Sequence, residues 1–372
     1  MRSRLLPCLA LLVTVRCAAS GEGGDAGPEL PGEADGGVGP TDTGPEPLSD
    51  ADGGVGPIDD AALNTEARVT AATQTAQTNP LCSVGTLPEG FYWEIGDRDG
   101  PLGAGTVQGN ATPLPAQVIA IASASKWIYS TYVLQKLGVV RESDVPFLHF
   151  TSGHVFPPLA AVKEATCGPT ETVGDCATEV TVSPRAVNKF YYSAGHFQFH
   201  AADVMGLAAL RGPGLTTEIT SQVGAFDFTY LQTNLAGGLN ASATGYAGFL
   251  RRMLRGEYVM AEQLGAAKVC ASSACSSGAV LSPAPTDEAW NYSLGHWVED
   301  DPRVGDHAFS SAGALGFYPW IDSSKTWYGV VARRADSPGG SQGVASLRCG
   351  RLIRQAWVTG LTVTSTTPTP PR

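Results

Sequence analysis

The spacing of hydrophobic residues changes from strand-like to helical at Ser123. From Leu87 to Val107, apolar and polar residues alternate on both sides of a Gly- and Asp-rich centre, which predicts a β-hairpin. After Ser123, apolar residues recur at helical spacing as far as Leu137, and the following Gly138 is a typical helix stop. Ser123 is therefore expected at the N-terminus of a mostly buried helix.

The remaining pattern predicts one sheet built from the two ends of a domain. Three strand signals lie in close succession, at residues 290–298, 308–322 and 326–333. Helical patches are expected at residues 201–210, 243–254 and 344–357. We expect a mixed α/β domain of the α+β type over residues 78–359. Its antiparallel sheet would be formed by the N- and C-terminal parts and flanked by helices, with a mainly helical subdomain inserted at about 139–285.

Residues 1–17 have the layout of a secretory signal, with Arg2 and Arg4 before a short apolar run. That run is too short to cross a bilayer. It ends at Cys17, which resembles the processing site of bacterial lipoproteins, where the cysteine receives lipid. Simple cleavage near residue 18 or 19 is the alternative. Either way we expect an exported protein, which would be periplasmic, a cell-surface lipoprotein or secreted, with a lipid anchor as its only membrane contact.

Composition separates a polar tether from the domain. Residues 18–77 are rich in Gly, Asp, Glu, Pro and Ala, and such a segment buries too little apolar surface to fold. Twelve acidic residues and no Lys or Arg lie between Cys17 and Glu66, which accounts for most of the net charge of -11. The rest is nearly neutral, so we expect no nucleic-acid partner. Residues 360–372 read as a disordered Thr/Pro tail.

Six cysteines remain beyond the signal, and an even number in an exported chain favours disulfides. Fifteen pairings are possible. We favour the two that close short loops and one that ties the start of the domain to its end: Cys167–Cys176, Cys270–Cys275 and Cys82–Cys349. A zinc site is disfavoured because neither spacing is C-x-x-C and no histidine is suitably placed. We expect neither a metal nor a cofactor.

Ser123 and Lys126 form an S-x-x-K pattern, which places a hydroxyl and an amine on one helical turn. An unprotonated lysine there can draw the serine proton. The alternative is an ordinary N-cap serine followed by a surface lysine. The segment 121–138 resembles the active-site helix of the serine β-lactamase and penicillin-binding protein family, in particular its class C and esterase branch. Three later segments resemble family landmarks in the right order: Tyr192-Ser193-Ala194, Ala236-Gly237-Gly238-Leu239 and Ser311-Ala312-Gly313.

The resemblance implies roles for individual residues. Ser123 would attack an acyl carbonyl, with Lys126 and Tyr192 sharing the base and acid work. The backbone N–H groups of Ser123 and Ala314 would form the oxyanion hole. The resemblance also assigns substrate contacts to Ala194, Ser311 and Gly313. Tyr191 and the pair His196 and His200, which lacks the Glu of a metalloprotease helix, are expected to serve packing.

Two departures from the family pattern narrow the chemistry. Ala194 stands where the family has Asn, and Ser311 stands where it has Lys or His, so no cation is available for a substrate carboxylate. His307 is about 13 Å away along a strand. We therefore expect a monomeric serine esterase or amidase acting on a small ester or neutral amide. The alternatives are a catalytically degenerate surface protein with a binding role, and a β-lactamase or D-Ala-D-Ala carboxypeptidase.

Overall fold

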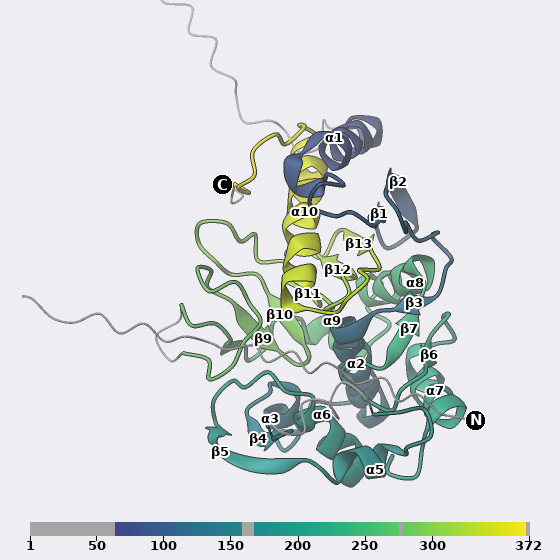
Figure 1. The fold of residues 1–372 in the computed structure, drawn as a ribbon, viewed down its shortest axis with the longest axis vertical. Helices are drawn as coiled ribbons and strands as arrows, with labels where there is room; N and C mark the ends of the chain where they lie inside the picture. The colour runs from purple at the N-terminus through teal and green to yellow at the C-terminus, as the bar shows by residue number, and fades with distance from the viewer. Residues whose placement is uncertain (1–63, 158–166, 275–277, 370–372) are drawn as a thin grey trace, which may run out of the picture. The chain divides into compact units, whose positions relative to one another are not determined.

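The computed structural model describes residues 64–157, 167–274 and 278–369, all within one compact unit (Figure 1). Its main sheet is antiparallel, with the strand order β2-β1-β13-β12-β11-β10-β9-β8. The strands are β1 (Gly90–Gly96), β2 (Pro101–Gln108), β8 (Val269–Cys270), β9 (Asn291–Ser293), β10 (His296–Val298), β11 (Phe309–Ser310), β12 (Tyr318–Ile321) and β13 (Tyr328–Ala332). The expected sheet, with strands from both ends of the domain, is confirmed.

Helices cover both faces of this sheet. In β13, Tyr328 accepts a hydrogen bond from Arg251 of α8 (Ala243–Leu254), whereas Val331 lies against Gly350 of α10 (Gly340–Thr359). Residues three apart in a strand point to opposite faces, so α8 and α10 pack on opposite sides. The expected helices at 243–254 and 344–357 are thus confirmed, the second with a longer span.

Helix α1 (Thr65–Thr78) lies within the segment expected to be a disordered tether, so that expectation is wrong for residues 65–77. Its buried side is mostly alanine, which gives little apolar periodicity but allows close packing against α10 (Figure 1). Arg68 donates to the carbonyls of Trp357 and Val358 at the end of α10. The prediction of a disordered tail from residue 360 onward is also wrong at its start. Val363 is buried, and its N–H donates to the Thr75 hydroxyl.

The inserted region is less helical than expected. Besides α7 (Gly212–Val223), α8 and α9 (Val259–Gln263), it contains a two-stranded sheet and two strands of a three-stranded sheet; α2 (Ser125–Leu137) and the third strand precede it in the chain. The two sheets consist of β4 (Ser152–Val155) and β5 (Thr181–Val187), and of β3 (Ile119–Ala120), β7 (Leu239–Ala241) and β6 (Thr229–Tyr230). The short helices are α3 (Val145–Leu148), α5 (Val173–Ala177) and α6 (Gly195–Phe199). The helix expected at 201–210 is instead α6 continued by a π-helical turn, His200–Val204, and ends before Gly206, whose φ is +70°.

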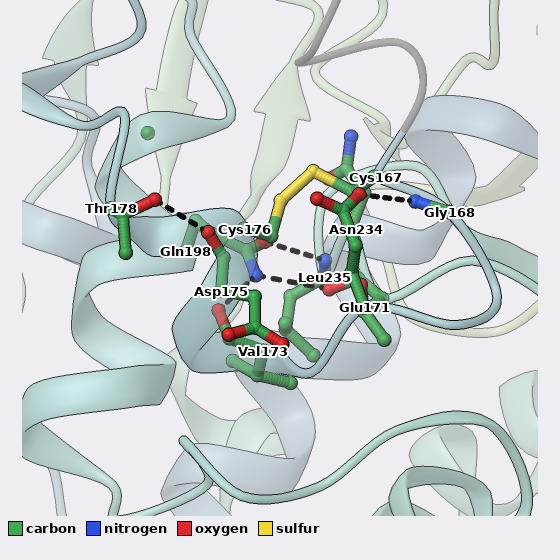
Figure 2. The surroundings of a disulfide bond; sticks show 12 residues. Cys167, Gly168, Glu171, Val173, Asp175, Cys176, Thr178, Gln198, Asn234 and Leu235 are labelled. Atoms are coloured by element: carbon green, nitrogen blue, oxygen red, sulfur yellow. Dashed lines mark hydrogen bonds between the residues drawn. A yellow bond between two sulfur atoms is a disulfide. The ribbon is translucent and has the colours of Figure 1, made fainter.

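Disulfides join Cys82 to Cys349 and Cys167 to Cys176, as expected. Cys275, the partner expected for Cys270, lies outside the described residues, as do the signal and most of the tether. Figure 2 shows the Cys167–Cys176 loop beside Gln198 and the segment at 234–235. None of the helices in the described ranges is long and apolar enough to span a membrane.

Candidate active site

Ser123 lies in a 3-10 turn (Ala122–Ala124) that leads directly into α2. Ala122 has a left-handed backbone with φ +46°, a strained conformation for alanine of the kind found at functional sites. Lys126 follows one helical turn later and is only 5% exposed. Its Nζ donates to the Ser123 Oγ over 2.9 Å and to the Ala236 carbonyl over 2.8 Å. The lysine is therefore a buried partner of the serine and not a surface residue.

The segment Ala236-Gly237-Gly238-Leu239, called the AGGL segment below, holds Lys126 in place. The Ala236 N–H donates to the Asn234 side chain, and the Gly238 N–H donates to the Asn234 carbonyl, which makes a tight turn. A Cβ on Gly238 would lie 2.4 Å from the Gln232 carbonyl, so the turn requires glycine. Gln198 of α6 fixes the start of this turn. Its amide donates to the Thr233 carbonyl and accepts from the Leu235 N–H (Figure 2).

Tyr192 faces Lys126 from the segment before α6. The Lys126 Nζ lies 4.6 Å from the centroid of the Tyr192 ring. That ring stacks on Trp297 of β10, with centroids 5.5 Å apart and planes inclined by 21°. Phe150 packs edge-on against it at 5.5 Å. The aromatic neighbours hold Tyr192 beside the Ser123–Lys126 pair, whereas Tyr191 lines neither of the cavities described below.

The segment after β11 closes the other side of the serine. The Ser311 hydroxyl donates to the Ser123 carbonyl over 3.2 Å. A Cβ on Gly313 would lie 2.1 Å from the Ile121 carbonyl, so only glycine permits this approach. Ala314 is the next residue along and lines the space around Ser123. The structure thus brings together Ser123, Lys126, Tyr192, Ser311, Gly313 and Ala314.

Two cavities meet at this cluster. One, of about 220 Å³, is apolar and lies between β10, the segment 283–285 and α10. The other, of about 590 Å³, has the polar residues Gln232, Asn234 and Asn240 in its lining. Ser123, Tyr192 and Ala314 line both cavities, so the serine hydroxyl stands at their junction.

The structure also places the residues that depart from the family pattern. Ala194 lines the larger cavity, and Ser311 is buried with 2% exposure. His307 has an exposed side chain that pairs with Asp300 over 3.0 Å, so it does not stand in for the missing cation. Sequence reasoning missed Asn234, which lines the larger cavity. Its position two residues before the AGGL segment was the only signal.

His196 and His200 are buried and bonded within the protein. His196 contacts Ser152 and the Tyr191 carbonyl, and burial lowers its pKa to about 3. His200 contacts the Tyr129 hydroxyl and the Asp144 carboxylate. These partners fit the packing role expected for both. Two tryptophans, Trp290 and Trp297, line the apolar cavity.

Solved structures with this fold include hydrolases acting on amides and a β-lactamase homologue. A D-amino acid amidase from Ochrobactrum anthropi SV3 matches with a TM-score of 0.52 and 10% identity, over 73% of this chain and 95% of that chain. A putative β-lactamase from Bacteroides dorei matches at 0.50 and 17%, over 72% and 94%. A D-stereospecific amidohydrolase from Streptomyces sp. matches at 0.50 and 13%, over 77% and 99%. No family model and no curated protein sequence matches the chain. The β-lactamase/transpeptidase-like fold expected from the sequence is confirmed.

Proposed function

We propose that this chain, with the fold of β-lactamase-like serine hydrolases, cleaves esters or neutral amides through an acyl-enzyme on Ser123. The observation that carries the proposal is the buried Lys126 amine, 2.9 Å from the Ser123 hydroxyl at the junction of two cavities. A buried amine within hydrogen-bond reach of a hydroxyl has the geometry of a general base and its nucleophile.

In the proposed reaction, Lys126 in its neutral form takes the Ser123 proton while Oγ bonds to the acyl carbon. The N–H groups of Ser123 and Ala314 stabilise the oxyanion that forms. The C–O or C–N bond of the substrate then breaks, and the proton passes through Lys126 and Tyr192 to the leaving group. Water attacks the acyl-enzyme in the second half, which releases the acid and returns the proton to Ser123.

The charge around the site favours a neutral substrate. Among the described residues that line the two cavities, Lys126 is the single one with a basic side chain, and its amine is engaged with Ser123 and Ala236. A substrate carboxylate would therefore find no cation such as the family Lys or His. This argues against β-lactams and peptides with a free C-terminus as substrates, and we expect nitrocefin turnover near that of a Ser123→Ala control.

Two measurements on the full chain test this proposal. A fluorophosphonate probe should label the wild-type protein on Ser123, which peptide mass spectrometry locates, and should not label Ser123→Ala. Hydrolysis of p-nitrophenyl acetate should fall to background in the same variant. Equal labelling of both proteins would reject the nucleophile. A wild type that neither reacts nor turns over any ester, amide or lactam would favour the degenerate surface protein.

Export is part of the proposal and rests on the N-terminal sequence alone. We propose that residues 1–17 are removed or that Cys17 carries lipid, and that the acidic tether separates the domain from a membrane. Intact-mass measurement of the protein expressed in a bacterial host distinguishes the two. A mature chain that still begins at Met1 would contradict both. Sedimentation of the purified chain tests the proposed monomer.

A further inference from the structure

The smaller cavity beside Ser123 has walls without a charged side chain among the described residues. Trp290 and Trp297 form one wall and are 1% and 4% exposed. The segment 283–285 forms another. It is held next to the tyrosine because the Tyr192 N–H donates to the carbonyl of the nearby Leu281. A small apolar space of this kind excludes ions and favours an apolar group.

Helix α10 supplies the third wall. Gly343 lies against the backbone of Gly313, where a Cβ would be 3.0 Å from the carbonyl oxygen, and this allows the helix to approach the strand edge closely. Val344 and Leu347 then reach the cavity from the same side of the helix. The cavity is therefore bounded by residues 283–297 on one side and by α10, which is distant in the chain, on the other.

A buried ion pair holds Trp290, one of the wall residues, in position. The indole N–H of Trp290 donates to Glu288, and Arg351 of α10 pairs with the same carboxylate over 2.7 Å. The Arg351 guanidinium also lies 4.8 Å from the Trp290 ring centroid. These contacts tie Trp290 to α10, so the cavity is preformed and a bound group need not order it.

We propose that this cavity selects substrates carrying an uncharged, ring-sized apolar group next to the scissile carbonyl, such as phenyl or benzyl. The inference rests on the proposed function and names its substrate class. A cavity of about 150 Å³ lined by apolar side chains binds benzene. The cavity here, of about 220 Å³, accommodates one such ring but not two.

Three esters followed by pH-stat test the proposal: methyl acetate, benzyl acetate and methyl phenylacetate. Methyl acetate has no ring, benzyl acetate carries the ring on the alcohol side of the carbonyl, and methyl phenylacetate carries it on the acyl side. We expect kcat/KM for at least one ring-bearing ester to exceed that for methyl acetate by about tenfold or more. Similar values for all three esters would overturn the proposal.

Cavity-filling variants connect the preference to these walls. Val344→Trp should reduce the ratio of ring-bearing to methyl ester by about tenfold, and Val344→Phe is the smaller change if the first does not fold. The matched control is Arg348→Trp, which adds the same side chain to an exposed position of α10 and should leave all three rates unchanged. Equal losses for all esters in the Val344 variants would contradict the proposal.

A binding measurement separates this inference from the proposed function. Fluorobenzene should bind the Ser123→Ala protein, seen as a shift or broadening of its fluorine NMR signal, and binding should be lost when Val344→Trp is added. Such binding without any ester turnover would retain the cavity and reject the hydrolase. Turnover without such binding would retain the hydrolase and reject the cavity.

Discussion

The Ser311 hydroxyl donates a hydrogen bond to the backbone carbonyl of Ser123 over 3.2 Å, joining residues 188 apart in the chain. The β-lactamase and penicillin-binding protein family, which the sequence resembles, has Lys or His at this position. Here a short neutral side chain turns toward the backbone of the proposed nucleophile. Ser311 thus contributes to the position of the serine turn and offers no charge to a substrate.

Removal of this hydroxyl should therefore affect stability. Ser311 is 2% exposed, and we expect Ser311→Ala to lower the free energy of unfolding by about 1 kcal/mol, the usual contribution of one hydrogen bond. Urea unfolding measures this. Ser341→Ala, at an exposed position, is the control and should be neutral. Equal stability of the two variants would show that the Ser311 bond contributes nothing.

Lys126 should be required as a proton acceptor and not only as a hydrogen-bond donor. We expect Lys126→Met to lower kcat/KM for p-nitrophenyl acetate by about 10²–10⁴, the usual contribution of general base catalysis. Lys126→Arg can still donate to Ser123 but cannot lose its proton, so it should be as impaired. Substantial activity in the arginine variant would contradict a base role for Lys126.

Helix α1 should stabilise the domain although it lies in a region of tether-like composition. Arg68 is 7% exposed and donates to two carbonyls at the C-terminal end of α10. We expect Arg68→Ala to cost about 1–3 kcal/mol, because those bonds involve a charged donor. Thermal or urea unfolding measures the loss, with the exposed Glu66→Ala as control. No difference between the variants would mean that α1 is dispensable.

Two buried histidines should make the domain acid-sensitive. Burial lowers the pKa of His196 and of His296 to about 3, while the unfolded value is about 6.5. Below pH 6.5 the unfolded chain binds protons that the folded chain does not, so stability falls from pH 6.5 toward pH 3. Each ring contributes about 1.4 kcal/mol per pH unit in that window.

Substitution of each histidine should reduce the slope of the free energy of unfolding against pH by about one proton. His296→Gln can still accept the Gly265 N–H bond but does not titrate, and we expect a slope shallower by about one proton. His196→Gln should have the same effect, and the double variant about twice that effect. Unfolding in urea between pH 4 and pH 7 measures the slopes. A wild-type slope in both single variants would refute the assignment.

Local sequence determined much of the fold and part of the site. The change of spacing at Ser123 predicted α2, since helical periodicity and a glycine stop are properties of neighbouring residues. The same helix places Lys126 one turn after Ser123, so that pair required no distant contact. Helix α1 could not be predicted in this way, because its Ala- and Thr-rich sequence has no strong apolar face and becomes buried only where α10 lies against it.

The surroundings of the serine were decided by tertiary structure. Trp297 and Val344 come from two segments far from Ser123, and no local pattern indicates that they line the smaller of its two cavities. The sequence alone thus determined a serine and a lysine on one helical turn, because backbone geometry is local. Which groups a substrate meets there depended on packing between distant segments, because side-chain burial is a property of the whole fold.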